Sequence, residues 1–478
     1  MIAMTSRRHR APAVLVATLT AALTATVAAT VAVPLLGSPA DARPSAHPAA
    51  HPAAHPGARS RPDDSLTTKT PYRPRGDLDS YQRAPRGFTP VFTENVSRHG
   101  SRTMSDADDG DVVLALVQAA EDQGALTAPG RRLSSQVTAQ LAVNERYGYG
   151  ELSPIGDREL RRTAQRLVRR LPSVFADAVS RERPIEVSAS SQSRTLDSAT
   201  QFTTGLTAAD PAIGDLIEPT VSDDTLLYFH KTDTAYQDYL ENDSRIGEAE
   251  DAALDAPRTH RVARAVLTRF FTAAFVDRIV AGDLADAGAD DEVAAAQSFY
   301  ALYQNAADVP GKLAAAGYLT HAQAAWFGYL DDVESFYENG PAFAGSDVTY
   351  AMAQPLLDDM FADLEAQRDG TSDAAADLRF THAEEIMPLA TLLGLPGSTE
   401  QVSTDSPYRY ADNDFRGARV APMAANIQWD LYRSGDRYLV RMLYNERQTR
   451  FKAGCAPVAP GSYFYDLDTL EECYGYSQ

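Results

Sequence analysis

Three widely separated segments of the chain repeat the same order of features. Each has a strand-like run, then a short loop that carries charged residues, then the start of a helix. The segments are TPVFTENVSRHGSR (89–102), RPIEVSASSQSRTLDSATQFTTGL (183–206) and DLRFTHAEEIMPLATLLGL (377–395). In an open α/β sheet, the carboxyl ends of the strands and the helix N-termini face one crevice. The pattern therefore predicts an α/β sheet on which these three loops converge.

The stretch between the second and third segments has a different character. Residues 207–375 are rich in Ala, Asp, Phe and Tyr and follow a helical period, as in HRVARAVLTRFFTAAFVDRIVAGDL (260–284) and DEVAAAQSFYALYQNAAD (291–308). We therefore expect an α/β core built from 81–206 and 376–478, with a mostly α-helical cap domain inserted at 207–375.

The N-terminal residues are typical of an export signal followed by a spacer. Basic residues at Arg7, Arg8 and Arg10 precede a long apolar run, and ADA at 40–42 fits a small-x-small cleavage site. Residues 1–42 are thus predicted to be a cleaved signal peptide, which makes the protein secreted or extracellular. An uncleaved membrane anchor is the alternative, because the apolar run is long. The repeated His-Pro segment in 43–80 predicts a disordered linker rich in His, Pro and Ala.

Composition restricts the kind of ligand. The formal net charge of −21 argues against nucleic acid, which needs a basic footprint. Lysine is scarce, so an anion site here has to be built from arginine. Two cysteines, Cys455 and Cys473, in an exported chain predict a disulfide, with two free thiols as the alternative.

The three loops carry residues whose chemistry fits phosphoryl transfer. Imidazole can attack phosphorus, guanidinium groups hold phosphate oxygens with two hydrogen bonds at once, and an acid protonates a poor leaving group. We expect no cofactor and a small anionic substrate. A metal site made of histidine and carboxylate is the alternative, but the neighbouring arginines would repel a cation. The loop residues concerned are Arg98, His99, Arg102, Arg194, His382 and Glu384.

Two of the motifs resemble those of a known family. RHGSR (98–102) is similar to the RHGxR signature of histidine acid phosphatases, and HAEEIMPLATLLGL (382–395) resembles the HAE variant typical of multiple inositol polyphosphate phosphatases. The resemblance implies that His99 is the phosphorylated nucleophile and Glu384 the proton donor. It also implies an α/β core with a helical cap and no metal. The residues that it implies for binding the scissile phosphate are Arg98, Arg102, Arg194 and His382.

The chain departs from that family pattern at two places. Met104 stands where the signature usually continues to proline, which leaves the rigidity of the loop after Arg102 open. His230 stands in LLYFHKTDTAY (226–236) where an aspartate is expected, which leaves the contacts of the cap open.

These observations predict a secreted phosphomonoesterase that hydrolyses inositol polyphosphates such as phytate through a phosphohistidine. Two alternatives remain. One is a broad-specificity acid phosphatase, and the other is an exported anion-binding protein that does not catalyse. No stable membrane partner is expected unless the signal stays uncleaved.

Overall fold

The computed structural model describes residues 62–311 and 315–476. The predicted signal peptide and the predicted linker up to residue 61 lie outside the described residues.

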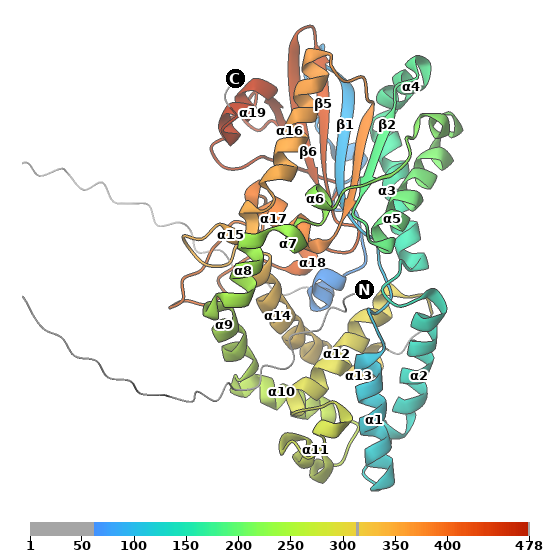
Figure 1. Cartoon of the computed structure of the whole chain (residues 1–478), viewed down its shortest axis with the longest axis vertical. Helices are drawn as coiled ribbons and strands as arrows, with labels where there is room; N and C mark the ends of the chain where they lie inside the picture. Colours follow the sequence, from blue (N-terminus) through green and yellow to red (C-terminus); the bar gives the residue numbers. More distant parts are fainter. Residues whose placement is uncertain (1–61, 312–314, 477–478) are drawn as a thin grey trace, which may run out of the picture. The chain divides into compact units, whose positions relative to one another are not determined.

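A mixed eight-stranded sheet forms the centre of the described chain (Figure 1). Its order is β3-β2-β4-β1-β5-β6-β7, and β8 pairs with β6. β2, β4 and β1 run parallel to one another, whereas β5 and β6 add to the sheet as an antiparallel hairpin next to β1. The α/β prediction is therefore confirmed. The strands are β1 (Thr89–Arg98), β2 (Ile185–Ala189), β3 (Val221–Ser222), β4 (Ala376–Thr381), β5 (Asn426–Ser434), β6 (Arg437–Tyr444), β7 (Arg447–Thr449) and β8 (Phe464–Asp466).

Helices cover both faces of this sheet. One apolar cluster joins α3, α4 and α5 to β2 and β4, and another joins α16 and α17 to β1, β5 and β6. The helices that pack on the sheet or on its covering helices are α3 (Pro154–Arg170), α4 (Pro172–Arg181), α5 (Ser193–Ala209), α6 (Asp224–Leu227), α15 (Val348–Ala351), α16 (Gln354–Asp369), α17 (Ala383–Leu392), α18 (Gly417–Val420) and α19 (Leu467–Tyr474), with η3 (Pro211–Leu216).

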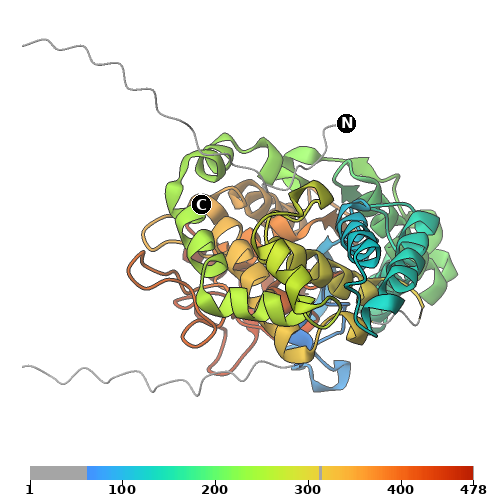
Figure 2. The same cartoon turned by 90° about the horizontal axis from the view of Figure 1, so that it is seen from below.

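A second group of helices has its own apolar core, at the end of the molecule seen in Figure 2. The cap predicted at 207–375 supplies most of them, but α1 and α2 also belong to this core, because they pack against α12. The helical part therefore draws on residues before 207 as well. Its helices are α1 (Asp108–Asp122), α2 (Gly130–Tyr147), α10 (Pro257–Leu267), α11 (Ala273–Val280), α12 (Glu292–Asp308), α13 (Ala315–Tyr318) and α14 (His321–Glu338), with η4 (Ala285–Ala287). The buried apolar residues of α7 (Phe229–Thr232), α8 (Thr234–Asn242) and α9 (Ser244–Leu254) belong instead to the apolar cluster of α16 and α17.

The N-terminal segment differs from the prediction of a disordered linker. Residues 62–80 contain two 3₁₀ helices, η1 (Pro62–Lys69) and η2 (Leu78–Ser80). η1 packs against α12, α14 and α18, and Ser65, Thr67 and Tyr72 are buried. Prolines and small polar residues predict a spacer from the sequence alone, whereas side chains far along the chain supply the contacts that fix this segment.

The C-terminal segment is joined to the body by the predicted disulfide. Cys455 and Cys473 form it, with their Cα atoms 5.4 Å apart. In the part of the chain that the structure describes, no helix has the length and apolar character needed to span a membrane.

Candidate active site

The three strand–loop–helix segments meet at one edge of the sheet, as the sequence predicts. β4 lies between β1 and β2, and the register pairs Arg98 with Thr381 and Ala189 with Phe380. The next residues of each segment therefore leave the sheet side by side. Arg98 ends β1, His382 is the N-cap of α17, and Arg194 lies in the first turn of α5.

His99 is buried and held in one tautomer. Its Nδ1 lies 2.9 Å from the carbonyl oxygen of Gly100, which can only accept, so Nδ1 carries the proton. The lone pair of the neutral ring is then on Nε2. Burial, followed by the charges of Arg98 and Arg194, lowers the pKa of His99 well below its usual value. The ring is therefore a neutral base and nucleophile at physiological pH.

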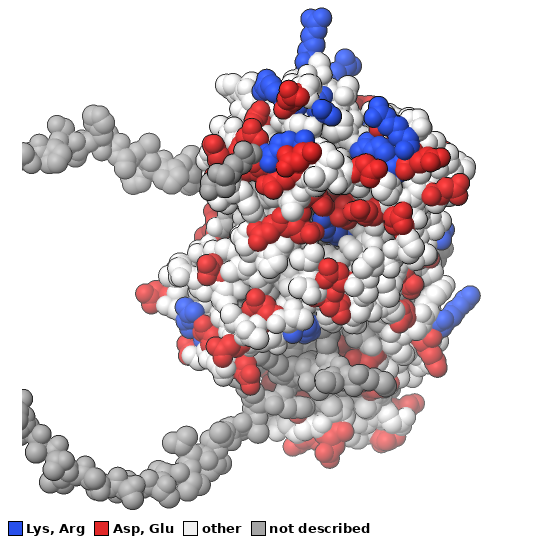
Figure 3. All heavy atoms as spheres, turned by 45° about the horizontal axis from the view of Figure 1, so that its top comes forward, with Lys and Arg blue, Asp and Glu red and all other residues white. Residues whose placement is uncertain are grey.

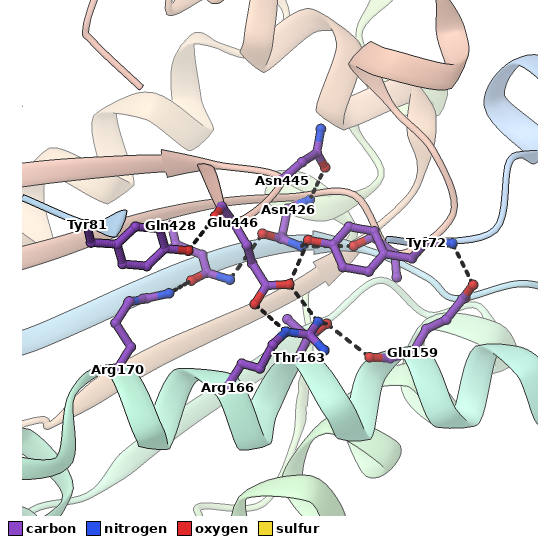
Figure 4. A network of polar contacts seen from close by, with 11 residues as sticks. Tyr72, Tyr81, Glu159, Thr163, Arg166, Arg170, Asn426, Gln428, Asn445 and Glu446 are labelled. Atoms are coloured by element: carbon purple, nitrogen blue, oxygen red, sulfur yellow. Dashed lines mark hydrogen bonds and ion pairs between the residues drawn. The ribbon is translucent and has the colours of Figure 1, made fainter. Parts of the chain in front are cut away.

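The loop after His99 is tightly packed and bonded. A side chain at Gly100 would meet the Cα of Gly156 at 2.6 Å, so only glycine fits there. Glu159 of α3 accepts from the backbone N–H of Ser101 at 2.7 Å and from its hydroxyl at 3.0 Å. The same carboxylate accepts from the backbone N–H of Tyr72 at 2.6 Å and belongs to the network in Figure 4.

Met104, the departure from proline, takes part in this packing. Its backbone N–H donates to Oδ1 of Asn144 at 2.8 Å, a hydrogen bond that proline cannot make. Its carbonyl accepts from the backbone N–H of Gly150 at 2.6 Å. Backbone hydrogen bonds therefore fix this loop without the proline.

His382 is also buried and hydrogen-bonded at both ring nitrogens. Arg194 Nη2 lies 3.1 Å from Nδ1, and because arginine only donates, Nδ1 accepts. Nε2 then donates to Oγ of Ser190 at 2.8 Å. Burial and the charge of Arg194 lower the pKa of His382 well below its usual value. The rings of His99 and His382 lie 5.5 Å apart, centroid to centroid.

Within the described chain, the three arginines form no ion pair with a carboxylate. Elsewhere the buried Arg379 and Arg441 form ion pairs with acids. Among the described residues, by contrast, Arg98 donates to backbone carbonyls, and the printed contacts of Arg102 and Arg194 involve no carboxylate. The Nε of each of these three is buried without a hydrogen-bond partner in the described chain.

Such clustered positive charge is unfavourable without an anion. Burial, together with repulsion from the neighbouring arginines, lowers the pKa of Arg102 to about 10. Acidic side chains are spread over the outer face of the molecule shown in Figure 3. The site is thus a cluster of positive charge in an acidic protein, and its unpaired Nε–H groups fit the oxygens of a phosphate.

The two glutamates of HAEE differ in their surroundings. Glu385 is fully buried and accepts from the backbone N–H of His382 at 3.2 Å, and it also bonds to Nδ1 of His230. Glu384 is half-buried. Burial raises the pKa of Glu384, but the charges of His230 and Arg98 outweigh this and leave its pKa below the usual value. Glu385 is a structural partner, whereas Glu384 faces the charges of the site.

Two further residues of the site were not predicted to be part of it. His230 is buried, and its ring lies 6.1 Å from that of His382, so the residue that departs from the family pattern belongs to the site. Lys69 lies close enough to Arg102, Arg98 and Glu384 for their charges to shift its pKa. The scarcity of lysine predicted an anion site built from arginine, so no sequence signal pointed to Lys69.

A metal site is not found among the described residues, where no group of three or more His, Cys, Asp or Glu side chains is arranged to hold an ion.

Comparisons with known proteins agree with this geometry. The family model of the histidine phosphatase superfamily, branch 2, matches residues 92–445. Multiple inositol polyphosphate phosphatase 1 of Gallus gallus is 24% identical over 410 residues, which cover 82% of this chain and 84% of that protein.

Solved structures share the fold. The crystal structure of Bifidobacterium longum multiple inositol polyphosphate phosphatase in complex with inositol hexasulfate has a TM-score of 0.81 and 30% identity, and covers 86% of this chain and 97% of that one. The phytase from D. castellii has a TM-score of 0.62 at 17% identity, covers 88% of this chain and 87% of that one, and supports the fold alone.

Proposed function

The chain belongs to branch 2 of the histidine phosphatase superfamily, and from this we propose that it hydrolyses phosphate monoesters of inositol through a phosphohistidine on His99. One observation carries the proposal: a neutral imidazole lies among three guanidinium groups whose buried Nε atoms have no hydrogen-bond partner in the described chain. The match to inositol polyphosphate phosphatases supports the substrate class.

The first chemical step transfers the phosphoryl group to the enzyme. Nε2 of His99 attacks phosphorus, and the bond from phosphorus to the ester oxygen breaks. Arg98, Arg102 and Arg194, with His382, bind the phosphate oxygens and stabilise their charge. Glu384 gives its proton to the inositol oxygen, which leaves as a hydroxyl.

The second step releases phosphate. Water attacks the phosphohistidine, Glu384 takes a proton from that water, and His99 leaves with its lone pair restored. Glu384 must be protonated for the first step, although its pKa is low beside His230 and Arg98. A bound phosphate places negative charge next to the carboxyl, which raises its pKa and favours the protonated form.

We also propose that the protein is exported, on the basis of the signal-like residues 1–42 and the disulfide between Cys455 and Cys473.

The test compares two substrates and two variants. Wild type should release phosphate from inositol hexakisphosphate faster than from a simple sugar phosphate, whereas similar rates would favour the broad-specificity alternative. His99→Ala should abolish both turnover and the trapped phosphoenzyme. His321→Ala, at the exposed start of α14, is the matched control and should behave as wild type.

Glu384→Gln tests the acid. General acid catalysis contributes roughly 10²–10⁴-fold, so most of that factor should be lost on inositol hexakisphosphate. The loss should be much smaller on p-nitrophenyl phosphate, whose phenolate leaves without a proton. Single-turnover measurement of the phosphorylation step is the readout, and an equal loss on both substrates would remove Glu384 from this role.

A further inference from the structure

Lys69 is held rigidly next to the arginine cluster. It ends η1, and the residues on either side of it are anchored. The carbonyl of Thr68 accepts from Nη1 of Arg98, and the carbonyl of Thr70 accepts from the backbone N–H of Met423 at 3.0 Å. The start of the Lys69 side chain is therefore fixed beside Arg98.

A second anchor joins this segment to the loop of the RHGSR motif. Glu159 accepts from the backbone N–H of Tyr72 with one oxygen (Figure 4). Its other oxygen accepts from the backbone N–H of Ser101. The segment that carries Lys69 and the loop that carries Arg102 thus share one carboxylate, and their relative position is set by it.

The ammonium group of Lys69 is a cation close to other cations. Within the described chain it forms no ion pair, and Asp331 and Glu384 are the acids whose charges act on it most. Burial, then repulsion from Arg102 and Arg98, lowers the pKa of Lys69 to about 8. At neutral pH and below it is still charged, and this cost to the folded protein is offset when an anion binds beside it.

The surroundings of Lys69 distinguish it from the groups that act on the scissile phosphate. Arg102 and Arg98 are the cations that act on it most strongly. The charges that act most on His99 and His382 come from Arg98 and Arg194, and Lys69 is not among the strongest there. Lys69 therefore interacts most strongly with Arg102 and Arg98 rather than with the two histidines. It also lies on η1, which packs against the cap helices α12 and α14.

A phosphate on His99 already has three guanidinium groups to bind it. A substrate with a single phosphate has no second phosphate for Lys69 to bind. An inositol polyphosphate, by contrast, carries further phosphates on neighbouring ring carbons. We propose that Lys69 binds a second phosphate of an inositol polyphosphate, next to the one that reacts, and so makes the site prefer polyphosphorylated substrates. This inference rests on the proposed function.

The experiment measures kcat and KM on inositol hexakisphosphate and on p-nitrophenyl phosphate. Lys69→Met keeps the aliphatic stem and removes the charge, and Lys69→Arg keeps the charge. Lys452→Met is the matched control, because Lys452 lies over the ring of Tyr474 and no charged group shifts its pKa.

Lys69→Met should raise KM for inositol hexakisphosphate roughly tenfold or more, as expected for one lost charge-assisted hydrogen bond. Its KM and kcat for p-nitrophenyl phosphate should change by much less, and Lys69→Arg should restore most of the loss. The thermal midpoint of Lys69→Met should be no lower than that of wild type, because a destabilised buried charge has been removed.

Three results would overturn the inference. They are an unchanged KM for inositol hexakisphosphate, an equal loss on both substrates, and a lowered thermal midpoint that accounts for the loss. A wild-type protein that does not hydrolyse inositol hexakisphosphate at all would instead overturn the proposed function, so the two failures are distinguishable.

Discussion

Arg194 makes a contact that lysine cannot copy. One of its terminal nitrogens donates to Nδ1 of His382, while its Nε is buried and directed to no described partner. The planar guanidinium can therefore orient the histidine and bind a phosphate oxygen at the same time. A lysine ammonium at this position has the charge but not the fork.

Arg194→Lys should therefore lose phosphatase activity with the fold intact. Loss of one charge-assisted hydrogen bond predicts at least a roughly tenfold lower kcat/KM. Steady-state kinetics measure this, and circular dichroism reports the fold. Arg158→Lys, on the exposed side of α3, is the matched control. Near wild-type turnover of Arg194→Lys would remove Arg194 from the site.

The sequence predicted the site residues that lie in motifs. It missed the residues that tertiary contacts bring to the site from other parts of the chain. The site residues on the strand ends were predictable because parallel strands end at one edge. Lys69 was missed because its segment has the composition of a linker, and only contacts such as that of Thr68 with Arg98 fix it. Glu385 and His230 meet across a long stretch of chain, and nothing in either local sequence indicates the pair.

The sequence predicts a helix boundary well where neighbouring residues alone determine it. Ser153 is of a residue type that favours the N-cap, and it caps α3 with its hydroxyl accepting from the N–H of Ile155 at 3.1 Å. The single helix predicted over 260–284 is instead two, α10 and α11. The break occurs because the backbone of Phe270 and Thr272 bonds to the loop at residues 125–127, a distant contact that overrides helical periodicity.

Glu159 of α3 links this helix to the N-terminal segment and to the loop of the RHGSR motif, so its substitution tests how these elements hold the site together. Its two oxygens accept from the backbone of Tyr72 and Ser101. Glu159→Gln replaces one oxygen with an amide group that cannot accept, so one buried N–H loses its partner. The unfolding free energy should fall by about 1–3 kcal/mol, and kcat should fall because the loop of Arg102 loosens.

Urea unfolding and steady-state kinetics measure the two effects of Glu159→Gln. Glu121→Gln, on the exposed surface of α1, is the control. A variant that keeps both wild-type stability and wild-type kcat would show that this carboxylate does not position the loop.

The whole molecule combines a strong negative charge with buried acids. The net charge is −21, and burial raises the pKa of Asp332 to about 8 and that of Asp308 well above its usual value. Asp430 has the opposite shift, because Arg170 and Arg441 outweigh its burial and lower its pKa. The acids without an arginine partner therefore prefer to be protonated in the folded protein.

The unfolding free energy should consequently fall as the pH rises from about 5.5 to about 8.5. An acid with a raised pKa binds more protons when folded than when unfolded, so its contribution is lost between its unfolded pKa near 3.8 and its folded pKa of about 8. Asp332→Asn should reduce this slope, because the amide oxygen still accepts from the N–H of Gly417 and the side chain no longer titrates. Asp436→Asn, in the exposed turn between β5 and β6, should leave the slope unchanged. Urea titrations across this pH range measure the slope. A wild-type stability that stays level or rises toward alkaline pH would mean that these buried carboxyls remain ionised in the folded protein.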